Sequence, residues 1–250
     1  MIPHQAVADQ GNDEGEGSKS CISPAVSLSK EVVMTSASGL ALKGLRDLST
    51  LQWYVIPLLA IVFYIYTSEI KKARETGNWD AVFAGLTLFG ADFLYETING
   101  WIFHITRYAA LWTTPGPTAL RTTVGWNIEI MFMFSIAGII YYNTLSSNRN
   151  ARIIGIPDGV FWSFSYAAFC VFVECLLNIG GLLVWEYPFW KLSPLGVLPI
   201  FFIAYFPCFL TPLAVIRMKS NRSKVKAVSG LYLAAGALNI IALGFLGWNY

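Results

Sequence analysis

The sequence predicts an all-α integral membrane protein, in which a bundle of about six transmembrane helices follows a disordered N-terminal tail. Of the 250 residues, 55% are hydrophobic and only 13% are charged, about half of the ~25% charged residues of soluble domains. So few charged groups could not cover the surface of a soluble domain. The apolar residues also form six runs long enough to cross a bilayer, which takes about 20 residues.

The six predicted spans follow one another between polar breaks. They are roughly 51–69, 81–105, 122–143, 159–185, 194–216 and 227–247. Each run is continuous rather than alternating, which favours helices over the strands of a membrane β-barrel. We expect the segment Trp185–Pro188 to end the fourth span. Pro199, Pro207 and Pro212 predict kinks in the fifth.

Residues 1–49 differ in composition from residues 50–250, and we interpret the two parts as a tail and a polytopic transmembrane domain. The tail is rich in Ser and Gly and carries the acidic patch Asp13–Glu16, which predicts disorder. No apolar segment of signal-peptide length follows the first Met, and early acidic residues are not typical of transit peptides. The segment Leu40–Leu48 fits either a short amphipathic helix on the membrane surface or an unstructured linker.

The distribution of Lys and Arg predicts the orientation of the chain. Ten of these residues lie in the first, third and fifth loops, and five lie on the opposite side. Because cytoplasmic loops carry an excess of Lys and Arg, we expect both termini on the non-cytosolic side. The sequon at Asn221 would then escape glycosylation. The sequence does not indicate which membrane holds the protein.

Several classes of chemistry lack their usual residues. The two His residues are too few for haem pairs, di-iron centres or His-rich zinc sites. The four Cys residues, at positions 21, 170, 175 and 208, have no CxxC spacing and are interpreted as buried free thiols. A net charge of +2 gives no reason to expect nucleic acid binding. We therefore predict no metal and no cofactor.

Four carboxylates within the predicted spans are the candidate catalytic residues. Asp92 and Glu96 lie in the second span, Glu129 in the third and Glu174 in the fourth. Ionisable residues inside a bilayer are costly, so each marks a functional hypothesis. At a rise of 1.5 Å per residue the acids lie at similar depths in three helices, which predicts one shared cavity. The alternative is that protonated acids join helices by hydrogen bonds.

Amides and aromatic residues accompany these acids. Asp92, Glu96 and Asn99 share one helix face, as do Glu174 and Asn178. Aromatic rings can stabilise a cation, although Trp is also typical of membrane interfaces. The expected substrate-binding residues are Asn99, Trp101, Trp126, Asn127, Asn178 and Asn239.

The preferred hypothesis is a membrane enzyme acting on a lipophilic substrate by proton transfer, as a cyclase or isomerase of an isoprenoid, terpenoid or sterol-like molecule. Glu96 and Glu174 would serve as acid and base, tuned by Asp92 and Glu129. The expected partners are the lipid bilayer and this small molecule. The alternatives are a proton- or cation-coupled transporter or channel, and a non-enzymatic scaffold or accessory subunit.

The general plan of a small helical bundle with membrane-buried acids is similar to that of the small fungal membrane terpene cyclases and of the sterol isomerases of the emopamil-binding type. This similarity covers the architecture alone. Neither family's residue pattern is present, so no residue role is carried over.

Overall fold

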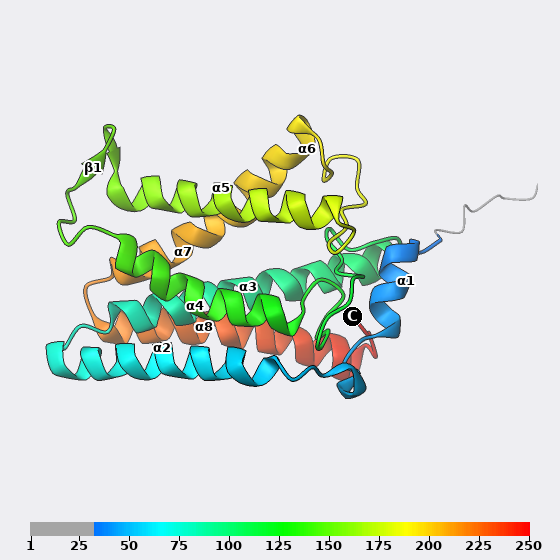
Figure 1. Cartoon of the computed structure of the whole chain (residues 1–250), viewed down its shortest axis with the longest axis horizontal. Helices are drawn as coiled ribbons and strands as arrows, with labels where there is room; N and C mark the ends of the chain where they lie inside the picture. Colours follow the sequence, from blue (N-terminus) through cyan, green and yellow to red (C-terminus); the bar gives the residue numbers. More distant parts are fainter. Residues whose placement is uncertain (1–32) are drawn as a thin grey trace, which may run out of the picture. The chain divides into compact units, whose positions relative to one another are not determined.

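The computed structural model describes residues 33–250 (Figure 1). The predicted disorder of the tail up to residue 32, its acidic patch and Cys21 lie outside the described residues. The first four elements that cover predicted spans are α2 (Val55–Thr76), α3 (Asp80–Thr106), α4 (Ile128–Thr144) and α5 (Asp158–Ile179). The fifth span comprises α6 (Pro194–Pro199), a π-helical segment (Ile200–Tyr205) and α7 (Phe206–Ile216), and the sixth comprises α8 (Asn221–Asn239) and a second π-helical segment (Ile240–Phe245).

The prediction of an all-α bundle is therefore confirmed. Within the described residues, four helical stretches are long and apolar enough to cross a membrane: α3, α5, the stretch from α6 to α7, and the stretch from α8 to residue 245. The apolar α4 has 17 residues. The helix α2 extends past the predicted end at residue 69 into the charged sequence Lys71–Glu75.

Two predicted boundaries differ from the structure for local reasons. The helix α4 begins at Ile128 rather than near residue 122, because the Asn127 side chain accepts a hydrogen bond from the Ile130 amide and caps the first turn. The helix α5 ends at Ile179, not at residue 185, and Gly181 follows in the left-handed region at φ 69°. The remaining apolar residues belong to a loop in which Leu183 is buried.

The proline-rich fifth span is irregular, as its sequence predicts. Pro199 ends α6, and the π-helical segment Ile200–Tyr205 follows directly. Pro212 lies inside α7. Since proline removes a backbone donor from a helix, neighbouring hydrogen bonds shift to a wider pattern.

The helix α3 is the centre of the bundle. It packs against α2, α4, α7 and α8, and in Figure 1 it runs behind α4 with α8 alongside. Its small residues, among them Ala84 and Gly85, allow neighbouring backbones to approach closely. Gly138 of α4 packs directly against the α3 backbone at this point. A Cβ atom at position 138 would lie 2.7 Å from the Ala84 carbonyl carbon and 2.8 Å from the Gly85 Cα.

We therefore expect Gly138→Ala to lower the free energy of unfolding by about 1–3 kcal/mol, the usual cost of overpacking. Backbone atoms form the obstacle, so no rotamer change can relieve it. Thermal unfolding in detergent measures the effect. The matched control is Gly230→Ala in α8, where an added Cβ meets nothing within 4 Å; equal melting temperatures for both variants would contradict the assignment.

A buried ion pair joins the first turns of α3 and α8. Lys224 and Asp80 are hydrogen-bonded to each other, and both residues are buried. The Arg149 guanidinium lies 4.0 Å from the other Asp80 oxygen, but its side chain is largely exposed. Lys224 is therefore the principal counter-charge of Asp80.

A short helix, α1 (Ser36–Lys43), precedes the bundle, followed by a single 3₁₀ turn at Leu48–Thr50. The helix begins before the segment Leu40–Leu48, for which helix or linker was expected, and shares residues 40–43 with it. Thr35 caps it and donates a 2.5 Å hydrogen bond to Glu186. The boundary at residue 49 between tail and domain stays a prediction.

Two short strands, β1 (Arg152–Ile153) and β2 (Ile156–Pro157), form an antiparallel hairpin between α4 and α5.

Candidate functional site

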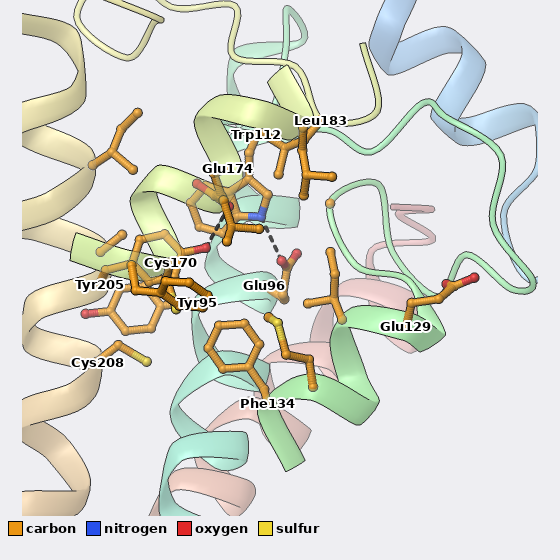
Figure 2. A pocket seen from close by; sticks show the side chains of 18 of the residues that line it. Tyr95, Glu96, Trp112, Glu129, Phe134, Cys170, Glu174, Leu183, Tyr205 and Cys208 are labelled. Carbon is orange, nitrogen blue, oxygen red and sulfur yellow. Dashed lines mark hydrogen bonds between the residues drawn. The ribbon is translucent and has the colours of Figure 1, made fainter. Parts of the chain in front are cut away.

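A largely apolar cavity of about 210 Å³ lies among α3, α4, α5 and the fifth helical stretch (Figure 2). Three of the predicted catalytic residues, Glu96, Glu129 and Glu174, line it together with Tyr205. The other lining residues include Tyr95, Trp112, Ile130, Met133, Phe134, Phe169, Cys170, Leu183, Trp190 and Cys208.

Glu96 projects from α3 and is held by the loop that connects α3 to α4. Its Oε1 accepts a 2.7 Å hydrogen bond from the Trp112 indole Nε1, and its Oε2 accepts a 3.3 Å bond from the Thr123 hydroxyl. The residue is only 3% exposed. Both carboxyl oxygens therefore act as acceptors, and the side chain is fixed in position.

Glu174 projects from α5 on the opposite wall. Its Oε1 accepts a 2.6 Å hydrogen bond from the Tyr205 hydroxyl, as the dashed line in Figure 2 shows. Within residues 33–250, no side chain or backbone group binds its second oxygen. Since Glu174 is also partly exposed, that oxygen is free to meet a ligand in the cavity.

Asp92 lies one helical turn before Glu96 but does not line the cavity. It is buried, and its Oδ2 accepts a 2.8 Å hydrogen bond from the Trp126 indole. The Trp126 ring in turn stacks on Phe93. Asp92 can influence the site only through its charge and through the position of α3.

Glu129 borders the cavity, but its carboxylate points away from the other acids (Figure 2). It accepts hydrogen bonds from the Tyr54 hydroxyl at 2.5 Å, the Thr118 hydroxyl at 2.5 Å and the Ala119 amide at 2.8 Å. These contacts tie the α3–α4 loop to α2. The four acids therefore do not form one cluster. The carboxylates of Glu96 and Glu174 face the cavity, Asp92 lies behind it, and the Glu129 carboxylate turns toward the α3–α4 loop.

The predicted substrate-binding amides make structural contacts outside the cavity lining. Asn99 binds the backbone of Leu111 and Trp112, and Asn178 donates to the Leu183 carbonyl. Asn127 caps α4 as described above. Asn239 donates to Thr97 and accepts from Tyr250. Trp101 packs edge-on against Trp248. None of these residues lines the cavity, and a role for them in substrate binding stays a prediction.

The loop between α3 and α4 covers one end of the cavity and is fixed by Arg121. This buried guanidinium donates to the carbonyls of Thr114, Gly116 and Ala41, at 2.8, 2.6 and 3.4 Å. Burial lowers the pKa of Arg121 from its ordinary value, while the carbonyl acceptors compensate the buried charge. These hydrogen bonds hold the loop in place over the cavity, so that the Trp112 indole can donate to Glu96.

Sequence reasoning missed four polar residues of the cavity, which are Tyr95, Trp112, Trp190 and Tyr205. Tyr205 lies in an almost wholly apolar sequence, Ile200–Leu210. Its hydroxyl group could have marked it as a candidate site residue. Trp190 lies in a loop far from the acids in sequence. Among residues 33–250, no cluster of three or more His, Cys, Asp and Glu side chains could hold a metal ion.

The fold and cavity define a class: α-helical, multi-pass membrane proteins with two glutamates in an internal apolar cavity. Residues 35–244 match an uncharacterized membrane protein family, and the chain belongs to that family. It is similar to an uncharacterized protein of Archaeoglobus fulgidus, with 41% identity over 214 residues that cover 86% of this chain and 99% of the relative. No solved structure matches the chain significantly. The protein is thus an integral membrane protein in contact with the lipid bilayer.

Proposed function

We propose that this protein is a membrane enzyme that cyclises or isomerises a lipophilic, isoprenoid- or sterol-like substrate by proton transfer between Glu174 and Glu96. The observation that carries the proposal is the presence of these two carboxyl groups in one apolar cavity. In the described part of the chain, neither forms a salt bridge with Lys or Arg. Two unpaired acids beside an apolar space fit proton transfer better than helix packing alone.

The hydrogen bonds around the two glutamates support different roles. Among residues 33–250, one Glu174 oxygen has no partner, so a proton there can be donated to an alkene or epoxide. Glu96 already accepts bonds on both oxygens from Trp112 and Thr123, which suits a carboxylate that takes a proton back from the resulting cation. The proton count of the substrate is unchanged. The step leaves Glu174 ionised and Glu96 protonated, and proton exchange with solvent returns both acids to their starting states.

Aromatic rings in the cavity wall support a cationic intermediate. Tyr95, Trp112 and Phe134 line the cavity beside the acids, and ring faces attract a positive charge in surroundings of low polarity. The scarcity of polar side chains keeps out water that would trap the cation.

A transporter or channel is the second candidate, but the packing disfavours it. A second, polar pocket lies at the opposite ends of α4, α5 and α7. The stretches of α4, α5 and α7 between the two sets of lining residues contribute four buried side chains, those of Tyr141, Ser163, Ala167 and Phe209. Since Phe209 also packs against the rings of Tyr141 and Tyr166, the layer is dense. If no enzymatic activity is detected, a role as a non-enzymatic scaffold remains.

Solvent deuterium tests the proposal. The purified protein in nanodiscs is incubated in D₂O with a panel of isoprenoid and sterol-like alkenes, and products are analysed by mass spectrometry. Because Glu174 would exchange its proton with solvent, we expect deuterium on a carbon of the product. The double variant Glu96→Gln/Glu174→Gln is the matched control. No deuterium in any product of the panel would contradict the proposal.

A further inference from the structure

The polar pocket has a volume of about 400 Å³ and lies at the end of the bundle where the β1–β2 hairpin connects α4 to α5 (Figure 1). It shares no lining residue with the apolar cavity. Its walls are the C-terminal ends of α2, α4 and α7, the N-terminal ends of α3 and α5, and the loop after α4. Since the ends of spanning helices meet the headgroup layer, the polar pocket lies at a membrane surface.

Three cationic side chains line the polar pocket: Lys72, Arg149 and Arg217. Within residues 33–250, none of these side chains donates a hydrogen bond to a protein acceptor. The Lys72 ammonium lies 3.9 Å from a Glu69 oxygen, and the Arg149 guanidinium lies 4.0 Å from an Asp80 oxygen. Arg217 forms no salt bridge in the same part of the chain. The three cations therefore have unused donors around one space.

The two acidic residues of the wall are already engaged. Asp80 is hydrogen-bonded to the buried Lys224, which does not line the pocket. Asp158 accepts a 2.9 Å hydrogen bond on its Oδ2 from the Ser146 amide. With Asp80 neutralised by Lys224, the three cations face one carboxylate. The excess of positive charge favours an anionic ligand.

The first turn of α5 adds to this preference. Gly159 lines the pocket, and no side chain caps the helix, which begins directly after Pro157. A Cβ atom on Gly159 would lie 3.3 Å from Arg217 Nη2, so the guanidinium lies against this turn. The amides and the positive end of the helix dipole attract anions. Arg217 and the start of α5 thus favour the same kind of ligand.

We propose that the polar pocket binds a phosphate group, which is carried by the headgroup of an anionic membrane lipid and is held by Lys72, Arg149 and Arg217. A guanidinium matches two phosphate oxygens at once, and an ammonium adds a point charge. The volume falls in the ~300–1,000 Å³ range of small-molecule pockets, which admits a headgroup while the acyl chains stay in the bilayer. Free phosphate has the same chemistry, so the test separates the two sources. This site is independent of the enzyme proposed above.

Two triple variants test the site. Lys72→Gln/Arg149→Gln/Arg217→Gln, the pocket variant, removes its three cations. The matched control, Lys71→Gln/Arg74→Gln/Arg222→Gln, also removes one Lys and two Arg at the same end of the bundle. The control positions are exposed and do not line the pocket. Both variants change surface residues, and size-exclusion profiles check that they remain monodisperse.

Native mass spectrometry from phosphate-free detergent solution measures binding of phosphatidylglycerol and of the diacylglycerol with the same acyl chains, which lacks the phosphate. Equilibrium dialysis measures binding of radiolabelled orthophosphate. We expect the wild type to prefer phosphatidylglycerol. The pocket variant should bind it at least about tenfold more weakly, as for one lost charge-assisted hydrogen bond. The control variant should keep the wild-type affinity.

Equal losses in the two variants, or equal binding of the two lipids by the wild type, would refute recognition of a lipid headgroup. Orthophosphate binding that is lost in the pocket variant alone, without a preference for phosphatidylglycerol, would assign the pocket to free phosphate. No binding of either phosphate-bearing probe would overturn the phosphate site altogether.

Discussion

Glu96→Gln and Glu174→Gln are each expected to reduce product formation by roughly 10²–10⁴-fold, the usual contribution of a general acid or base. The amide keeps the size of the side chain and can still accept the bonds from Trp112 or Tyr205, but it does not titrate. Both variants should therefore insert and remain monodisperse in detergent. Initial rates in the deuterium assay measure the loss of product formation. Size-exclusion profiles show separately whether the variants remain monodisperse.

Glu129→Gln is the discriminating control for these variants. Its carboxylate is bound to Tyr54, Thr118 and Ala119 and points away from the cavity, so the geometry predicts nearly full turnover and a lower melting temperature. Wild-type turnover in both Glu96→Gln and Glu174→Gln would rule out the acid–base mechanism. Misfolding of both would instead favour a structural role for the acids.

Lys224→Met is expected to lower the free energy of unfolding by about 3–5 kcal/mol, the usual cost of removing one partner of a buried ion pair. The substitution keeps an apolar side chain of similar length but leaves the buried Asp80 without its principal counter-charge. Arg149 cannot replace it fully, because it is 4.0 Å away and exposed. Reversible unfolding in mixed detergent micelles measures the loss.

Two further variants separate the ion pair from other effects. Lys226→Met changes an exposed residue two positions away and should alter stability by less than about 0.5 kcal/mol. The double variant Asp80→Asn/Lys224→Met removes the stranded charge and should recover most of the loss. A double variant as unstable as Lys224→Met alone would show that the packing of Lys224, not its charge, supports the bundle.

The sequence predicted the helices because bilayer-length apolar runs depend on composition alone. It located their ends less well, since those depend on single contacts. Asn127 caps α4 several residues inside the apolar run, and Gly181 ends α5 while the sequence is still apolar. An apolar residue such as Leu183 can be buried in a loop as well as in a helix.

The candidate site was harder to predict because depth along a helix does not give the direction of a side chain. Glu96 and Glu174 were expected at one level, and they line the same cavity. Glu129 was expected at a similar level, yet it lies in the first turn of α4 and binds the adjoining loop. The donors that hold the acids, Trp112 and Tyr205, come from a loop and from a distant helix, and no local pattern links them to the glutamates.

The pairing of Asp80 with Lys224 has a consequence for biosynthesis. The two residues are 144 positions apart, and ribosomes add about 5–20 residues per second, so the second partner is made roughly 7–30 s after the first. During that interval α3 has entered the membrane while its acidic first turn lacks the neighbour it will have in the finished bundle. Water or lipid headgroups at the membrane surface must solvate Asp80 until α8 arrives. Docking of α8 is thus the step that completes assembly around α3.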